Sequence, residues 1–162
     1  MSTDSVLTYP RTVFREDHEM LRDTIRRFLE RECIPRQAQW DQDGRVDRET
    51  WLKAGREGLL CTTLDPEWGG AGGDFGHAAV IVEEIARSGV AGLGFGLHSD
   101  VVAPYISRLG TPEQKQQWLP RCATGEVILA IAMSEPGAGS DLKAIRTTAR
   151  REGDEYVISG AK

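Results

Sequence analysis

Long apolar runs and a surplus of positive charge are both missing from this sequence. No stretch approaches the roughly 20 apolar residues that span a bilayer, and the N-terminus, MSTDSVLTYPR, has no apolar signal core. The 25 Asp and Glu residues against 20 Lys and Arg give a net charge of −5. We therefore expect a cytoplasmic globular protein that neither spans a membrane nor binds nucleic acid. Anionic ligands remain compatible, because local main-chain amides bind phosphate whatever the net charge.

Cysteine is scarce and carries no metal-binding pattern. The three cysteines, Cys33, Cys61 and Cys122, lie far apart and form no CxxC pair. This spacing predicts reduced thiols without a disulfide and without a metal site.

Histidine is equally scarce, with three residues in the chain. His18 and His77 are expected to be solvated. His98 and Asp100 lie two positions apart, so on a helix they point to different faces. This spacing favours a structural or pocket-lining role over a metal or catalytic pair.

What the sequence does have, over its first three quarters, is helical periodicity. A helix is expected over residues 15–33, bent or ended by Pro35, with a turn at residues 41–45. Capping and apolar spacing place four further helices: one after Asp47, one with Ala78, Ile81, Val82 and Ile85 on one face and closed by Gly89, one ending at Leu109, and one begun by the capping box Thr111-Pro112-Glu113-Gln114. Residues 64–76 are too rich in Gly and Pro for regular structure.

The pattern changes to β near residue 125. Residues 127–133, VILAIAM, read as a short buried strand, and RTTARREGDEYVISG alternates around a Gly153-Asp154 turn. The sequence thus predicts a mainly α fold, with a helical domain over residues 1–124 followed by the first strands of a second domain over residues 125–162.

Three glycine-rich segments need weighing. The pairs Gly70/Gly72 and Gly92/Gly94 lack the third glycine of a dinucleotide fingerprint. The segment SEPGAGSD, residues 134–141, has no following Gly-Lys-Ser/Thr and is therefore no triphosphate loop. Two interpretations of it remain open: a plain surface loop, or a loop whose proline, glycines and hydroxyls hold a ligand.

Several segments together resemble the acyl-CoA dehydrogenases. AIAMSEPGAGSDLKAIRTTARREGDEYVISGAK is similar to the start of that family's β domain. LRDTIRRFLERECIP, LDPEWGGAGGD and LGTPEQKQQWLPRCATGE resemble its helical domain in the same order. HSDVVAPYI and RETWLKAGREGLL look most like the long-chain type. The resemblance implies an N-terminal helical domain followed by the start of a β-barrel-like middle domain, and FAD as cofactor.

The resemblance also implies site residues. Ile131, Met133 and Ser134 would lie against the flavin, with the Ser134 hydroxyl bonded to the polar edge of the ring. Gly139 and Ser140 would lie by the ligands' pyrophosphate, Ser140 chiefly towards the CoA thioester. Two positions depart from the family pattern: Ile131 stands where many relatives have an aromatic residue, and Ser134 replaces a commoner threonine.

No catalytic residue is assigned within this chain. The family's catalytic glutamate and the Trp-Ile-Thr segment that completes the flavin site are expected beyond Lys162, so the chain alone is expected to be inactive. Glu135 is expected to shape the loop and to transfer no proton.

Partners implied by the resemblance are an acyl-CoA substrate, an electron-transfer flavoprotein, and further copies in a homotetramer or homodimer. Two alternatives remain open: a non-catalytic helical interaction module derived from this fold, or a related flavoenzyme with a different substrate.

The fourth helix would run beside the acyl chain in this family. Here its start contains Gly92, Gly94 and Gly96. These glycines either leave volume for a long chain or form a loop before a shorter helix that begins near His98.

Overall fold

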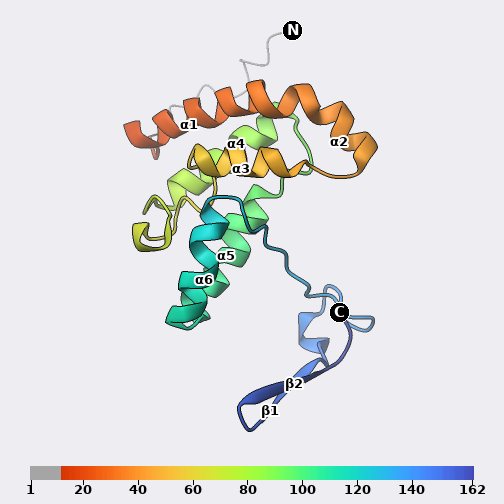
Figure 1. Cartoon of the computed structure of the whole chain (residues 1–162). Helices are drawn as coiled ribbons and strands as arrows, with labels where there is room; N and C mark the ends of the chain where they lie inside the picture. The colour runs from red at the N-terminus through yellow and green to blue at the C-terminus, as the bar shows by residue number, and fades with distance from the viewer. Residues whose placement is uncertain (1–11) are drawn as a thin grey trace. The chain divides into compact units, whose positions relative to one another are not determined.

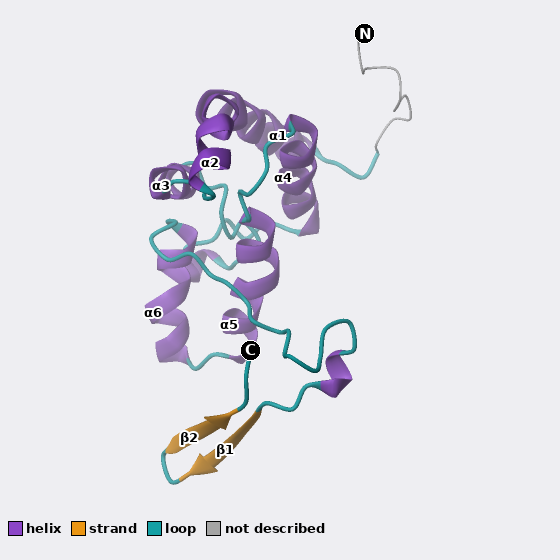
Figure 2. Ribbon diagram, turned by 90° about the vertical axis from the view of Figure 1, so that its right-hand side faces the viewer, coloured by secondary structure: helices purple, strands orange, loops and turns teal. Residues whose placement is uncertain are grey.

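The structure is a computed structural model that describes residues 12–162. It divides into two compact units, one ending at Leu129 and the other formed by Ala130–Lys162. The first unit is helical, and the second contains a two-stranded antiparallel sheet, as Figure 2 shows. The mainly α fold expected from the sequence is thus confirmed.

The helices begin and end largely where capping residues predict. Asp47 accepts a hydrogen bond from the Thr50 N–H, and Thr111 and Gln114 form the expected reciprocal cap. No helix among residues 12–162 is both long and apolar enough to cross a bilayer. The elements are α1 (Glu16–Phe28), the π-helix η2 (Leu29–Cys33), the 3₁₀-helix η3 (Ile34–Arg36), α2 (Gln37–Asp43), α3 (Arg48–Arg56), the 3₁₀-helix η4 (Pro66–Trp68), α4 (Phe75–Ser88), the π-helix η5 (Leu97–Val102), α5 (Ala103–Leu109), α6 (Pro112–Ala123), the 3₁₀-helix η6 (Leu142–Ala144), β1 (Thr148–Glu152) and β2 (Glu155–Ser159).

Both π-helices lie just before a proline. A proline has no N–H, and its ring crowds the carbonyl four residues earlier. A wider turn relieves this crowding: the Ile34 N–H bonds the Leu29 carbonyl ahead of Pro35, and the Ala103 N–H bonds the His98 carbonyl ahead of Pro104. Pro35 therefore changes the type of helix rather than ending the helical path.

The prediction of a turn at residues 41–45 is wrong for residues 41–43. Residues 41–43 belong to α2, and the chain turns only at Gly44, whose φ of 67° is left-handed. The helix can reach this point because the path through η2 and η3 stays helical across Pro35, which sequence spacing does not reveal.

The core of the first unit lies between its helices. In Figures 1 and 2, α1 packs along α4 and α5 packs along α6. One apolar cluster gathers around Phe28, Leu59 and Phe95, and a second contains Leu119 and Cys122. All three cysteines are buried and free.

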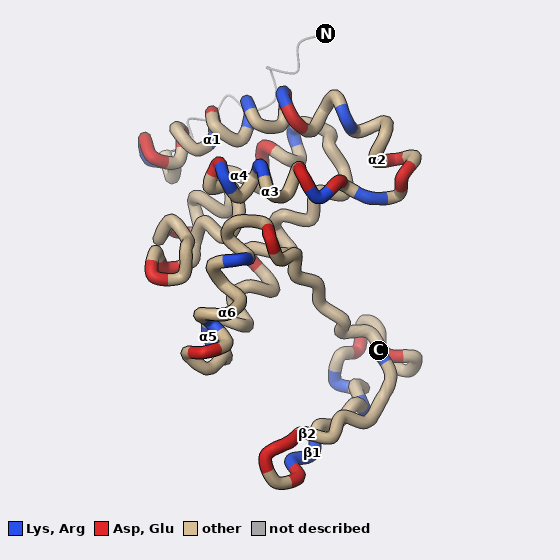
Figure 3. The backbone as a smooth tube through the Cα atoms, in the orientation of Figure 1, with Lys and Arg blue, Asp and Glu red and all other residues tan. Residues whose placement is uncertain are grey.

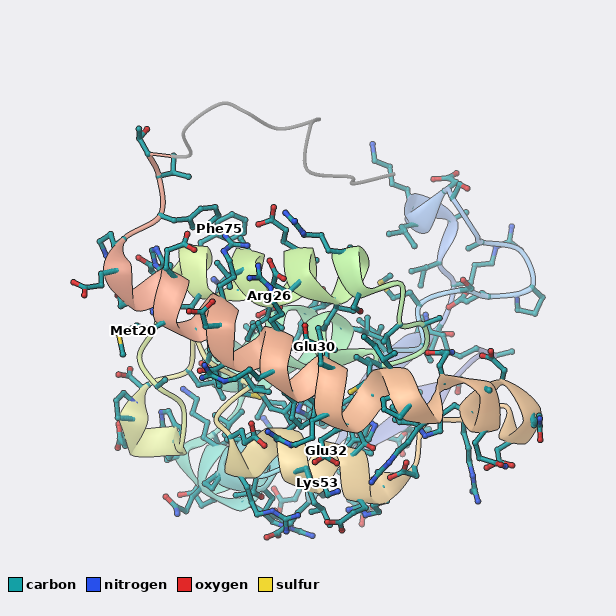
Figure 4. All side chains as sticks on the ribbon, turned by 90° about the horizontal axis from the view of Figure 1, so that it is seen from above. Met20, Arg26, Glu30, Glu32, Lys53 and Phe75 are labelled. Carbon is teal, nitrogen blue, oxygen red and sulfur yellow. The ribbon has the colours of Figure 1, made fainter. Side chains whose placement is uncertain are left out.

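A buried ionic cluster ties α1 to α4. Arg22, 8% exposed, donates to Glu84 at 2.8 Å and to Glu83 at 2.9 Å, and Arg26 donates to Glu84 at 3.1 Å. Figure 4 labels Arg26 where α1 faces α4. Burial works against the charged form of Glu84, but these hydrogen bonds outweigh it and lower its pKa.

A second ionic contact ties the η2 segment to α3. Lys53 donates to Glu32 at 2.6 Å, and Figure 4 labels the two side chains beside each other. Hydrogen bonds from Lys53 and then Arg31 lower the pKa of Glu32. Elsewhere acidic and basic residues alternate along the helices, as Figure 3 shows for α1 and α3.

The expectation that His18 and His77 are solvated is wrong. His18 is 1% exposed, and the His77 side chain is 16% exposed. His18 accepts the Arg15 N–H at 3.1 Å through Nδ1, and His77 accepts the Asp74 N–H at 3.1 Å in the same way. Each histidine thereby caps the helix on which it lies, α1 or α4, and the two rings meet edge to face at 4.4 Å.

The buried strand expected at residues 127–133 is also wrong. The segment has no regular structure, and Ile128 and Met133 are 41% and 43% exposed. A strand needs partners for its main-chain groups. Among residues 12–162, β1 and β2 pair only with each other. Within residues 127–133, Val127 and Leu129 pack against the second apolar cluster.

The sheet of the second unit is the expected hairpin. β1 and β2 pair from Thr148 opposite Ser159 to Glu152 opposite Glu155. The two-residue turn at Gly153-Asp154 requires a left-handed first residue, and Gly153 has a φ of 64°.

Glu135 fastens the loop that precedes the hairpin. Its carboxylate, 7% exposed, accepts the N–H of Arg146 at 2.7 Å and of Thr147 at 3.0 Å, and lies 3.2 Å from the Lys162 ammonium. Lys162 also donates to the Met133 carbonyl at 3.0 Å. This one side chain therefore holds together segments that are more than ten residues apart in the sequence.

We expect Glu84→Ala to destabilise the first unit by about 3 kcal/mol, because it leaves the buried Arg22 guanidinium short of a counter-charge. Urea unfolding followed by circular dichroism measures the change. Asp23→Ala is the matched control, since Asp23 also pairs with Arg26 but is 65% exposed, and should cost under about 0.5 kcal/mol. Equal losses in the two variants would contradict a special role for the buried cluster.

We expect Glu135→Gln to speed hydrogen exchange at the Arg146 and Thr147 amides several-fold, because the new NH₂ group cannot accept an N–H. Glu155→Gln, on the exposed strand β2, should leave these two amides unchanged. Unaltered exchange in Glu135→Gln would show that the carboxylate does not hold the loop.

The same contact sets a pH range. The Arg146 and Thr147 hydrogen bonds lower the pKa of Glu135 from 4.5 to about 2. Because the folded-state pKa is depressed, the stabilisation is fully present above pH 4.5 and is lost as pH falls towards about 2. The Arg146 amide resonance should therefore titrate near the lower value, and a midpoint near the ordinary one would contradict the geometry.

Candidate functional site

The five site residues suggested by the sequence lie within one short segment of the second unit. Ile131 is half-buried, and Met133, Ser134, Gly139 and Ser140 are exposed. A turn at the centre of the segment is closed by two main-chain hydrogen bonds between Glu135 and Ala138, at 2.9 and 3.0 Å. The residues on either side of this turn are thereby brought close together.

Two glycines of this loop have no reason within the described chain to be glycine. Neither Gly137 nor Gly139 has a left-handed φ, and a Cβ added at either would meet no atom within 4 Å. Neither backbone conformation nor packing among residues 12–162 excludes a side chain there. The missing side chains instead leave main chain accessible to a closely approaching ligand.

The loop also presents hydrogen-bonding groups that other residues do not use. Among residues 12–162, no hydrogen bond engages the hydroxyls of Ser134 and Ser140 or the N–H groups of Gly137, Gly139 and Ser140. Consecutive free N–H groups beside hydroxyls suit an anionic or polar ligand such as a pyrophosphate. The residues present therefore fit a nucleotide-type cofactor.

Glu135 gives this loop shape rather than acid-base chemistry. Both of its carboxylate oxygens accept main-chain N–H groups, and its pKa is lowered to about 2, chiefly by the Arg146 N–H. A base of so low a pKa removes protons poorly near neutral pH. Glu135 is therefore a poor proton acceptor whose role is to hold the loop, and ligand binding by the loop stays a prediction.

Lys162 is a residue of this loop that sequence reasoning missed. Its ammonium joins the Met133 carbonyl and the Glu135 carboxylate. These residues are more than 25 positions away in the chain, and no periodicity links them, so no sequence signal was available.

The three glycines near the start of the η5–α5 helix, the fourth helix expected from the sequence, fall into two groups. Gly92 and Gly94 have left-handed φ values of 80° and 68° and lie in a loop, whereas the helix begins at Phe95 and contains Gly96. A Cβ on Gly96 would lie 3.3 Å from Val82 and 3.8 Å from the Asp100 carboxylate. The loop interpretation is thus right for the first two glycines, whereas Gly96 lies within the helix, where a Cβ would crowd Val82 of α4. A role in acyl-chain length stays a prediction.

His98 has the structural role expected of it. It is fully buried; its Nδ1 accepts the Leu129 N–H and its Nε2 donates to the Cys122 carbonyl, both at 3.1 Å. Burial lowers its pKa. Asp100 points elsewhere and lines a groove between α4 and α5.

One group of side chains outside the loop has metal-ligand chemistry. The ligand atoms of Asp17, His18 and His77 lie within 4.8 Å of one another. The position of a cation is, however, already taken by the Arg15 guanidinium, which donates to Asp17 at 2.9 Å and to Asp74 at 2.8 Å. This cluster joins the starts of α1 and α4.

Comparison with known proteins identifies the family. Residues 15–126 match the family model described as acyl-CoA dehydrogenase, N-terminal domain. The mitochondrial long-chain specific acyl-CoA dehydrogenase of Sus scrofa is 45% identical over 152 residues, which are 94% of this chain and 35% of that protein. The chain thus spans about a third of the length of such relatives.

Solved structures give the same result. An acyl-CoA dehydrogenase from Geobacillus kaustophilus has a TM-score of 0.85 and 49% identity over 92% of this chain and 39% of its own. A glutaryl-CoA dehydrogenase from Mycobacterium smegmatis in complex with FADH2 has a TM-score of 0.81 and 27% identity over 91% of this chain and 38% of its own. The chain belongs to the acyl-CoA dehydrogenase family and corresponds to its N-terminal helical domain and the residues that follow.

Proposed function

We propose that the protein to which this chain belongs is an FAD-dependent acyl-CoA dehydrogenase that introduces an α,β double bond into a fatty acyl-CoA. The observation that carries the proposal is the loop at residues 134–140. Gly137 and Gly139 are required neither by conformation nor by packing, and among residues 12–162 no hydrogen bond engages the N–H groups of Gly137, Gly139 and Ser140 or the hydroxyls of Ser134 and Ser140. Family membership supplies the reaction class, and the loop supplies a place for the cofactor.

In this proposal the loop binds and orients. Ile131 and Met133 pack against the flavin ring, and the Ser134 hydroxyl bonds its polar edge. The N–H groups of Gly139 and Ser140 bond pyrophosphate oxygens, with Ser140 facing the CoA thioester. FAD, when bound, supplies the capacity to accept a hydride. The proton acceptor is expected outside this chain, which is therefore expected to be inactive alone.

We also propose that the protein acts on a long-chain substrate and passes electrons to an electron-transfer flavoprotein. We further propose that it assembles as a homotetramer or homodimer and has a cytoplasmic location. The name of the Sus scrofa relative gives a mitochondrial location for that protein. A flavoenzyme with another substrate and a non-catalytic helical module remain the alternatives.

The chain alone should retain little or no FAD, whereas the longer protein should be yellow as purified. The loop provides one wall of a site, and a few contacts do not offset the entropic cost of association. Visible absorbance after gel filtration measures the bound flavin. Stoichiometric flavin on residues 1–162 alone would show that the binding determinants have been misplaced, and a colourless longer protein would favour the helical module.

The loop glycines allow a sharper test in the longer protein. Gly137→Ala and Gly139→Ala should each weaken FAD binding about tenfold or more, because a methyl group would occupy space needed by the ligand. Thermal stability without FAD should be unchanged or slightly raised, since both positions accept alanine.

Gly153→Ala is the matched control. Gly153 has a left-handed φ of 64°, so alanine there should lower stability by about 1 kcal/mol and leave FAD affinity unchanged. Undiminished FAD binding in both loop variants would rule out close cofactor contact with residues 137–139.

A further inference from the structure

A second recessed surface lies on the helical unit, between α4 and the η5–α5 helix. The groove has a volume of about 790 Å³, within the range that holds small ligands. Its walls are mainly apolar, and Figure 4 labels Phe75, which is 83% exposed at the start of α4. The apolar lining side chains are Phe75, Ala78, Ala79, Val82, Ala86 and Pro104.

One carboxylate faces this apolar groove without a counter-charge. Asp100 is half-buried, and no hydrogen bond or ion pair engages its carboxylate among residues 12–162. Burial raises its pKa to about 6. Glu83, the other acidic residue of the groove, differs because Arg22 donates to it at 2.9 Å. Asp100 is therefore the group whose negative charge lacks compensation.

The backbone holds Asp100 firmly in this position. The residue lies in the π-turn that precedes Pro104, where the Ala103 N–H bonds the His98 carbonyl. Its neighbour Ser99 accepts the Cys61 N–H at 2.9 Å, and His98 is fixed in the core. Gly96, one turn earlier, packs close to Val82 of α4, since a Cβ on it would lie 3.3 Å from that side chain. The carboxylate is thus pre-positioned, which reduces the entropic cost of binding a partner.

We propose that the α4–α5 groove binds a linear apolar chain ending in a primary ammonium group, with the ammonium paired to Asp100 and the chain along the apolar wall. An ammonium group supplies both the missing charge and several hydrogen-bond donors to a partly desolvated carboxylate. A hydroxyl supplies a donor alone, and a carboxylate would be repelled. The site is separate in sequence and unit from the flavin loop and needs neither flavin nor turnover.

Arg108 is the positively charged residue of the groove and would favour an anionic ligand instead. Its exposed guanidinium also lines the groove, two helical turns beyond Asp100. If Arg108 governed binding, an anionic chain would be preferred. The ionisable residues that line the groove are Glu83 on α4, Asp100 on η5 and Arg108 on α5.

The test titrates the 162-residue chain with octylammonium, 1-octanol and octanoate while amide resonances of α4 and α5 are followed by NMR. Near pH 7.5, well above the pKa of Asp100, octylammonium should bind at least about tenfold more tightly than octanoate, with octanol between them. Asp100→Asn should weaken octylammonium binding about tenfold and leave octanol unaffected. Arg108→Gln is the control and should leave octylammonium binding unchanged or slightly tighter.

Acidification provides a readout that needs no variant. Protonation of Asp100 below its pKa of about 6 should weaken octylammonium binding to the unmodified chain at about pH 5, whereas octanol binding should not change. Preference for octanoate, identical octylammonium affinity in Asp100→Asn, or resonances that do not respond to any probe would each overturn the proposal.

Discussion

His98 is the residue on which the arrangement of the helical unit depends most directly. It has no exposed surface, and its two ring nitrogens join the Leu129 N–H to the Cys122 carbonyl. The end of α6 and the segment leaving it are thus both held to η5. The Trp51 ring meets it edge to face at 5.4 Å, which brings α3 into the same contact. Since burial lowers its pKa, the ring stays neutral and keeps one nitrogen as donor and the other as acceptor.

Sequence reasoning succeeded where structure is decided by neighbours in the chain. Asp47, Thr111 and Gly153 are local signals, because a cap or a two-residue turn needs only a few consecutive residues. It failed where distant partners decide. His18 is buried because the start of α4 packs over it, and residues 127–133 are not a strand because no described strand pairs with them. The two π-helices are an intermediate case. Pro35 and Pro104 are local signals in the sequence, but the sequence analysis did not predict that each would widen the helical turn before it.

The loop at residues 134–140 also combines features that local sequence predicts with features that depend on distant residues. Its glycines and hydroxyls were apparent in SEPGAGSD, and the structure adds that Gly137 and Gly139 are required neither by conformation nor by packing. The fastening of the loop by Glu135 to Arg146, Thr147 and Lys162 involves positions that no spacing rule connects. The sequence therefore identifies the candidate ligand-binding groups of the loop but not the residues that hold the loop in place.

The charged groups that hold the framework of this protein differ from the groups on its two candidate binding surfaces. The buried or shielded carboxylates of Glu84 and Glu135 accept several donors each, and their lowered pKa values show that the charged form is stabilised. Such groups have little left to offer a ligand. The loop at residues 134–140 instead presents neutral donors that are suited to anionic oxygens, whereas the α4–α5 groove presents one carboxylate without an ion pair among residues 12–162 on an apolar wall. The two surfaces thus differ in the charge they would favour, and a ligand suited to one should be a poor ligand for the other.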